Sequence, residues 1–172
     1  IEKTLLCVLR LVALGISLWI LVYNYQAQDQ SHNTVFREYG QALLAPLPRS
    51  SLYLTHGDLS VGLVRYMQGC LSFRTDIRVF DRTLLATNWS RRHITGNLPG
   101  VKVPGMMYRR DGSPGSYTLG AFFDANIQHF PIFTDKLGVS KLVDDNSWQD
   151  RYEVEPFGLC YSVHLKQTPP DT

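Results

Sequence analysis

The triplet His56-Gly57-Asp58 carries the residue types best suited to chemistry, between a strand-like run and a helical pattern. Open α/β sheets place ligand sites at such junctions. Gly57 permits a tight turn, and Asp58 could act in catalysis or bind a hydroxyl group. Alternatively, Asp58 is the helix N-cap, whose carboxylate accepts a hydrogen bond from a backbone N–H in the first turn. Because a carboxylate at a helix N-terminus repels anions, the junction does not favour a phosphate site.

Charged residues gather after this junction, namely Arg65, Arg74, Asp76, Arg78 and Asp81. They could bind a polar or phosphorylated ligand. Equally, they could form ion pairs that fix a loop or a sheet edge. The spacing alone leaves both interpretations open.

The known signatures of catalysis and cofactor binding are missing from the sequence. It contains no GxGxxG, P-loop, HExxH or GxSxG motif, and no His and Cys at metal-ligand spacing. We therefore expect no nucleotide, no metal and no other cofactor in this segment. We also expect no self-sufficient catalytic constellation.

The composition narrows the class of protein. The 172 residues suffice for one domain of ordinary size. A content of 44% hydrophobic, 12% aromatic and 19% charged residues excludes a disordered chain. The net charge of +2 and the lack of basic clusters argue against a nucleic-acid partner. Since the chain begins with Ile1 rather than Met, we expect it to be a piece of a longer protein.

Residues 4–23 have the composition of a membrane-spanning helix. Their only charge is Arg10, and a helix of this length crosses the hydrocarbon core of roughly 30 Å. Trp19 and Tyr23 lie near the far end, where aromatic rings prefer the interface. A signal peptide would need small residues after the apolar run, and a buried soluble helix is seldom this long and apolar all round. We predict a transmembrane helix over residues 1–25, in contact with membrane lipid.

The charges around this helix predict its orientation. Lys3 and Arg10 lie at its first end, and the next charge beyond it is Asp29. The positive-inside rule therefore places the first end in the cytosol and the rest of the chain on the lumenal side. The tripeptide Asn88-Trp89-Ser90 is an N-glycosylation sequon in that predicted lumenal part.

Cys70 and Cys160 are the only cysteines outside the predicted span. In an oxidising compartment such a pair can form a disulfide, which would tie the end of the domain to its middle. The alternative is that both are small buried hydrophobic residues. We predict the disulfide.

These residues are positioned by an α/β domain that we predict over residues 26–166, before a polar tail over residues 167–172. Apolar residues alternate in strand-like runs and recur at helical spacing between the runs. The order strand, helix, strand, helix favours Rossmann-like βαβ units and a mostly parallel sheet. The last run predicts a strand or a hairpin. The predicted strands are 51–55, 76–85, 131–134 and 152–165, and the predicted helices are 31–44, 59–70, a stretch through Trp89 and Ile94, and 118–130.

Short motifs follow one another along the domain. They are Thr55-His56-Gly57-Asp58-Leu59, Leu63-Val64-Arg65-Tyr66, Arg74-Thr75-Asp76-Ile77-Arg78, Asp81 and Leu98-Pro99-Gly100-Val101. In this order and spacing they resemble the C-terminal part of the transmembrane protein 260 family, over roughly residues 20–165. The resemblance fails at Ser60-Val61-Gly62, where the family has a Pro-Gly-Asn-like turn, and over residues 109–117.

The resemblance implies a polytopic O-mannosyltransferase of the endoplasmic reticulum membrane, with this domain on the lumenal side. It implies transfer of mannose from dolichyl-phosphate mannose to Ser or Thr of receptor extracellular domains. The catalytic acidic residue of such enzymes belongs to an early lumenal loop, so no catalytic residue is carried over to this chain. The matched positions are candidate binding residues, namely Asp58, Arg65, Tyr66, Asp76 and Asp81.

We therefore expect an acceptor-holding or structural segment of the enzyme. One alternative is a membrane-anchored binding or scaffold module without catalysis. Another is a small α/β enzyme with its site at Gly57-Asp58.

Overall fold

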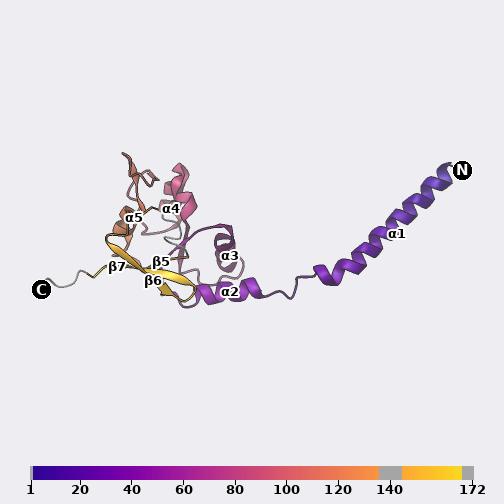
Figure 1. Ribbon diagram of the computed structural model, residues 1–172, viewed down its shortest axis with the longest axis horizontal. Helices are drawn as coiled ribbons and strands as arrows, with labels where there is room; N and C mark the ends of the chain where they lie inside the picture. Colours follow the sequence, from indigo (N-terminus) through magenta and orange to yellow (C-terminus); the bar gives the residue numbers. More distant parts are fainter. Residues whose placement is uncertain (1, 136–144, 168–172) are drawn as a thin grey trace. The chain divides into compact units, whose positions relative to one another are not determined.

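The computed structural model describes residues 2–135 and 145–167. The chain divides into two units, with the boundary between Val35 and Phe36. The first unit consists mainly of α1 (Glu2–Gln28), a single helix of 27 residues (Figure 1). Within its stretch Lys3–Tyr25 an 18-residue window has a mean hydropathy of 2.5, and the stretch could cross a membrane, judged by length and composition. The predicted helix is present and ends at Gln28 rather than at residue 25.

Two polar side chains of α1 are satisfied within the helix itself. Ser17 Oγ donates to the carbonyl of Ala13 at 2.9 Å, and Asn24 Nδ2 donates to the carbonyl of Ile20 at 2.9 Å. An unpaired donor in hydrocarbon costs several kcal/mol. These internal bonds therefore make both side chains compatible with lipid surroundings.

Five strands of the second unit form one mixed sheet. They are β1 (Leu52–Thr55), β2 (Arg78–Asp81), β5 (Ile132–Thr134), β6 (Tyr152–Phe157) and β7 (Cys160–Leu165). Their order is β2-β1-β5-β7-β6. β1 is parallel to both β2 and β5, whereas β7 is antiparallel to β5 and forms a hairpin with β6. The predicted α/β fold with a mostly parallel sheet is confirmed, and its last element is the hairpin.

Helices cover both faces of this sheet. They are α2 (Val35–Leu44), α3 (Asp58–Gly69), α4 (Asn88–Asn97) and α5 (Leu119–Asn126). Tyr53 of β1 belongs to the buried cluster that includes α2 and α3 residues, whereas Leu52 and Leu54 belong to the cluster that includes α4 and α5 residues. Because both faces are covered, β1 is apolar without the alternation of a half-exposed strand.

The segment predicted as a strand over residues 76–85 is split in two. Only Arg78–Asp81 forms β2, and the 3-10 helix η1 (Arg82–Ala86) follows directly. Asp81 causes the turn, because its Oδ1 accepts hydrogen bonds from Thr83 N at 2.9 Å and Thr83 Oγ1 at 2.7 Å. A short polar side chain thus offers the backbone an alternative to the strand ladder.

The start of α3 differs from the expected cap. Gly57 is the N-cap, with φ of 90° and ψ of 153°, a backbone conformation that is essentially limited to glycine. Asp58 is the first residue of the helix, so its interpretation as the N-cap is wrong. Its carboxylate instead lies at the positive end of the helix dipole, where negative charge is favourable.

Candidate functional site

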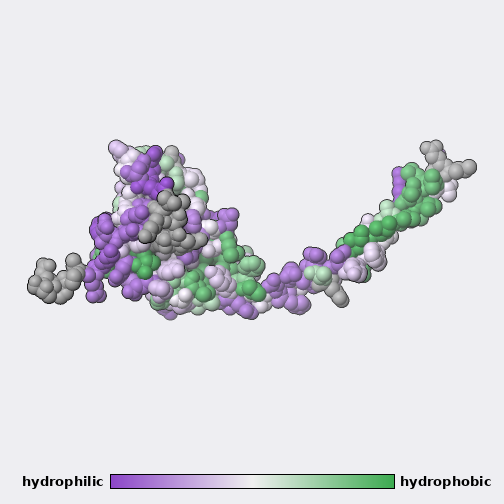
Figure 2. Space-filling view, viewed as in Figure 1, coloured by the Kyte–Doolittle hydropathy of each residue, from purple (hydrophilic) through white to green (hydrophobic). Residues whose placement is uncertain are grey.

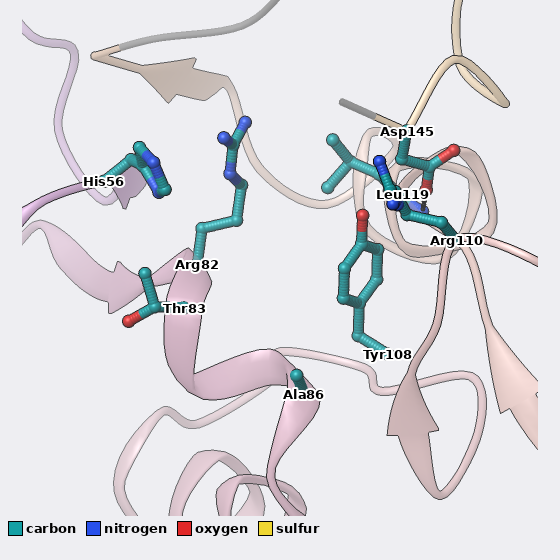
Figure 3. Close-up of a pocket in the computed structure, with 8 residues that line it drawn as sticks. All are labelled: His56, Arg82, Thr83, Ala86, Tyr108, Arg110, Leu119 and Asp145. Atoms are coloured by element: carbon teal, nitrogen blue, oxygen red, sulfur yellow. Dashed lines mark hydrogen bonds between the residues drawn. The ribbon is translucent and has the colours of Figure 1, made fainter. Parts of the chain in front are cut away.

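A cavity of about 240 Å³ opens at the carboxyl edge of the parallel strands (Figure 3). Parallel strands end at a common edge, and this edge is where open α/β sheets bind ligands. His56 follows β1, and Arg82 and Thr83 follow β2. The cavity is lined by His56, Arg82, Thr83, Ala86, Tyr108, Arg110, Leu119 and Asp145.

Two aspartates shape the loops that carry the first of these residues. Asp135, directly after β5, accepts a hydrogen bond from His56 N through Oδ2 at 2.8 Å. Its Oδ1 is buried and has no hydrogen-bond partner among the residues that the structure describes. Asp81 bends the chain at Thr83 and so places Arg82 at the cavity. Both aspartates therefore position other residues.

Another side of the cavity includes Tyr108 of β3 (Met107–Tyr108), which pairs in parallel with β4 (Ser116–Tyr117). The ring of Tyr108 packs edge-on against that of Tyr117, with 6.3 Å between the centroids. Arg109 pairs with Asp111 at 3.1 Å on the surface, whereas the next residue, Arg110, lines the cavity.

Asp145 joins the cavity to the N-terminus of α5. Its Oδ2 accepts a hydrogen bond from Leu119 N at 2.6 Å, and its Oδ1 accepts one from Ser147 N at 2.8 Å. Ser147 Oγ accepts a further bond from Gly120 N at 3.0 Å. A buried carboxylate thus satisfies backbone donors at a helix N-terminus, where negative charge is favoured. Since both oxygens are engaged, Asp145 is poorly placed to act as a general base.

The lining supplies more hydrogen-bond donors than acceptors. Arg82 and Arg110 carry permanent charge and His56 offers ring nitrogens, and the carboxylate of Asp145 accepts backbone hydrogen bonds. The hydroxyl of Thr83 donates to Asp81 Oδ1, the same oxygen that accepts from Thr83 N, which is the geometry of a local turn. Among the described residues, no three or more His, Cys, Asp or Glu form a group that could hold a metal ion. The arrangement favours binding of an anionic or hydroxyl-rich group over acid–base chemistry.

The five predicted binding residues do not meet in this cavity. Asp58 and Tyr66 line an apolar groove on the surface of α3. Arg65 and Asp81 line a separate cavity of about 120 Å³. Asp76 lies elsewhere, paired with an arginine. Whether any of the five binds a ligand stays a prediction.

Asp76 belongs to a clamp on the loop that follows α2. Arg74 Nε and Nη2 donate to its two oxygens at 2.9 Å and 3.0 Å, and Ser50 N donates to it at 3.2 Å. The side-chain hydrogen bonds from Arg74 lower the pKa of Asp76 to about 2. The Arg74 guanidinium also donates to the carbonyls of Leu44, Ala45 and Pro48. The contacts of Arg74 and Asp76 are therefore those of residues that stabilise the fold.

Cys70 and Cys160 are free thiols in the structure. Cys70 is exposed at the end of α3, and Cys160 is buried at the start of β7. Burial raises the pKa of the Cys160 thiol to about 11, which disfavours the reactive thiolate. The disulfide stays a prediction. If the bridge is present, neither Cys70 nor Cys160 reacts with a maleimide before reduction, whereas free thiols predict modification of Cys70 and not of Cys160.

The predicted glycosylation site coincides with the start of α4, whose first residue is Asn88. The side chains of Asn88 and Ser90 lie outside the described residues. Trp89, between them, is exposed and packs edge-on against His93 at 5.5 Å between centroids. Modification at Asn88 therefore stays a prediction.

Sequence reasoning found His56 but missed most of the cavity. Arg82 lies inside the strand predicted over residues 76–85, so the pattern does not place it after the carboxyl end of β2 (Arg78–Asp81). Arg110 lies in the segment where no family motif matched. The hydrogen bond that Asp145 accepts from Leu119 N connects distant parts of the chain, so no local pattern indicates it.

Comparison with known proteins identifies relatives across nearly the whole chain. A protein O-mannosyl-transferase tmem260 from Dictyostelium discoideum is 33% identical over 167 residues, which is 97% of this chain. A protein O-mannosyl-transferase TMEM260 from Mus musculus is 26% identical over 142 residues, 80% of this chain. The chain spans about 20% of the length of each relative. No protein-family profile and no solved structure matches it.

Proposed function

The chain belongs to the transmembrane protein 260 family, and on that premise we propose that it is the lumenal, acceptor-holding segment of an O-mannosyltransferase of the endoplasmic reticulum membrane. The whole enzyme would transfer mannose from dolichyl-phosphate mannose to Ser or Thr of receptor extracellular domains. The observation that carries the proposal is the match along 97% of this chain to a relative named as a protein O-mannosyltransferase.

The chemistry of the described residues supports a binding role over a catalytic one. Inverting or retaining transfer of a sugar needs a carboxylate that is free to act as a base or nucleophile. In the cavity at the sheet edge, Asp145 already accepts two backbone hydrogen bonds. The neighbouring Asp81 and Asp135 each accept a backbone hydrogen bond through one oxygen, from Thr83 N and His56 N. The catalytic carboxylate would then come from another part of the enzyme.

The cavity suits a polar stretch of an acceptor protein. Arg82 and Arg110 can bind carboxylates or carbonyl oxygens, and arginine does so with two donors in a fixed geometry. Tyr108 offers an aromatic ring beside them. Such a site would hold the acceptor near the membrane while the transfer takes place.

The test compares acceptor and donor dependence in the full-length enzyme. We expect the double variant Arg82→Ala/Arg110→Ala to raise the KM for the acceptor domain about tenfold or more, since each charged hydrogen bond contributes about 1.5–3 kcal/mol. The KM for dolichyl-phosphate mannose should stay unchanged. Arg91→Ala/Arg92→Ala, which removes two exposed arginines of α4, is the matched control. An unchanged acceptor KM in the cavity variant would contradict the role of this site.

The competing function is a membrane-anchored scaffold that takes no part in transfer. The binding character of the cavity fits that function as well. Deletion of residues 36–172 from the full-length enzyme separates the two, with mannosylation of a receptor domain measured by mass spectrometry. Loss of transfer with the membrane part still inserted supports acceptor holding, whereas undiminished transfer supports the scaffold.

A further inference from the structure

A groove of about 410 Å³ runs along the outer surface of α3 beside the first turn of α2. It is lined by Phe36, Asp58, Leu59, Gly62, Leu63 and Tyr66. Figure 2 shows hydrophobic surface gathered over α2 and α3. Phe36, Leu59 and Tyr66 are 56%, 63% and 41% exposed. A contiguous exposed apolar surface of this kind marks a site of interaction.

The groove results from the way the two helices pack. Gly40 of α2 lies against α3 so closely that a Cβ there would be 2.7 Å from Met67 Cγ and 3.2 Å from Leu63 Cδ1. Phe36 precedes Gly40 by one helical turn, so it lies on the same side of α2. The close approach therefore continues as a shallow trough where α2 begins, next to Leu59.

Of the apolar side chains that line this trough, the folded core accounts only for Leu63. The core positions of α3 are Leu63, Val64 and Met67. Leu59 and Tyr66 have the spacing of one helical stripe and lie outside that core. Gly62 lies between them, and its added Cβ would meet nothing within 4 Å. The stripe is thus an open surface rather than part of the packing.

The position of the trough along the chain indicates what covers it. α1 ends at Gln28 and α2 begins at Val35, so residues 29–34 are all that separates them. Even fully extended, a tether of this length reaches only about 20 Å. The first turn of α2 therefore cannot leave the neighbourhood of the membrane that α1 crosses.

We propose that the trough of α2 and α3 contacts the lipid bilayer at the boundary between headgroups and acyl chains. Amphipathic surfaces that bind there bury their apolar side about 5–10 Å deep. Phe36, Leu59 and Tyr66 supply that apolar side. The proposal rests on α1 spanning the membrane, and it requires no mannosyl transfer.

The charged residue of the trough, Asp58, and those next to trough residues in the sequence, Arg37, Glu38 and Arg65, give the contact no net charge. Arg37 and Arg65 are balanced in formal charge by Glu38 and Asp58. A balanced rim gives no net attraction to anionic lipid. We therefore expect the contact to form equally on phosphatidylcholine vesicles and on vesicles that contain phosphatidylserine, with little dependence on salt.

The experiment measures the depth of spin labels in the whole 172-residue chain, reconstituted into phosphatidylcholine vesicles. Cys7→Ser and Cys70→Ser remove the two exposed thiols, and the buried Cys160 is kept. A nitroxide is placed at Leu59→Cys, with Met106→Cys, also exposed and apolar, as the matched control. We expect oxygen, which concentrates in lipid, to collide with the label at position 59 several-fold more often than a water-soluble nickel complex. The control label should favour nickel.

A third label at Leu14→Cys reports whether α1 lies in the hydrocarbon. If position 14 is in lipid and position 59 is in water, the lipid contact is overturned while the membrane span stands. If neither position is in lipid, both are overturned. If position 59 becomes shielded from both reagents only in the full-length enzyme, a protein surface covers the trough and the lipid assignment is wrong. Circular dichroism confirms folding of each variant, and none of these outcomes depends on transferase activity.

Discussion

At the scale of single residues, Arg74 of the Arg74–Asp76 clamp makes most of its hydrogen bonds with backbone carbonyls. Arg74 holds carbonyls of Leu44, Ala45 and Pro48 as well as the carboxylate of Asp76. It does so with a φ of 50°, in the left-handed region that non-glycine residues rarely occupy. The motif position thus has a structural explanation that needs no ligand.

Replacement of this arginine should destabilise the fold. We expect Arg74→Ala to lower the free energy of unfolding by about 2 kcal/mol, because several hydrogen bonds to a charged group are lost. Arg109→Ala is the control, since the Arg109–Asp111 pair is more than half exposed and such pairs contribute about 0–1 kcal/mol. Denaturant unfolding of the detergent-solubilised chain measures both. Equal effects of the two substitutions would contradict the clamp.

The Arg74–Asp76 clamp also predicts how the stability of the fold depends on pH. The pKa of Asp76 in the folded chain is about 2, below the value of about 3.9 of an unperturbed aspartate. Its contribution to stability is therefore complete above that unfolded value and is lost as the pH falls through 2. The stability difference between the wild type and Asp76→Asn should shrink as the pH is lowered from 5 to 2. A difference that does not change with pH would show that Asp76 does not stabilise the fold as a carboxylate.

At the scale of elements, the start of α5 depends on a distant segment. Asp145 and Ser147 accept hydrogen bonds from the first N–H groups of the helix, and Thr118 Oγ1 accepts one from Ala121 N at 3.4 Å. Gly120 makes the contact possible, because a Cβ there would be 2.7 Å from the carbonyl oxygen of Ser147. The contact holds one wall of the sheet-edge cavity.

A methyl group at position 120 should displace the backbone of Ser147 from the start of α5. We expect Gly120→Ala to cost about 1–3 kcal/mol of stability, since backbone atoms have to move. Gly96→Ala, inside α4 with open space around it, should be neutral or stabilise by up to about 1 kcal/mol. Thermal unfolding followed by circular dichroism compares them. A Gly120→Ala chain as stable as the Gly96→Ala chain would refute the close contact.

These elements differ in how far the sequence could predict them. β1 and α3 could be predicted, because their apolar patterns are set by burial against neighbouring residues. The end of β2 could not, because a hydrogen bond from Thr83 to Asp81 overrides a pattern that continues to read as a strand. The cap of α5 by Asp145 could not either, because local propensity carries no information about contacts between segments far apart in the chain. The cavity depends on the end of β2 and on the cap of α5. The sequence could therefore predict at which edge of the sheet a cavity lies, but not which residues line it.

At the scale of the whole molecule, a candidate membrane helix precedes an α/β unit with its own two-sided core. The positive charges at the first end of α1 predict that this unit lies in the lumen. Lumenal exposure makes the sequon at Asn88 accessible to the glycosylation machinery.

Glycan attachment therefore tests the topology. Expressed in cells with its membrane helix, the wild-type chain should migrate faster on a gel after glycosidase treatment, and Asn88→Gln should remove the shift. Ser90→Ala is a second variant that destroys the sequon while keeping the asparagine. A wild-type chain that is insensitive to the glycosidase would contradict glycosylation at this site, and a shift that survives both substitutions would place the glycan elsewhere.

The position of β7 in the sheet has a consequence for synthesis of the chain. β5 pairs on one side with β1 and on the other with β7, which includes some of the last described residues. While the ribosome is still making residues 160–165, the outer edge of β5 has no partner, and open strand edges promote aggregation. The nascent domain therefore has to be protected until its final hairpin emerges. A premature stop before residue 160 should yield an aggregating chain rather than a shorter folded one.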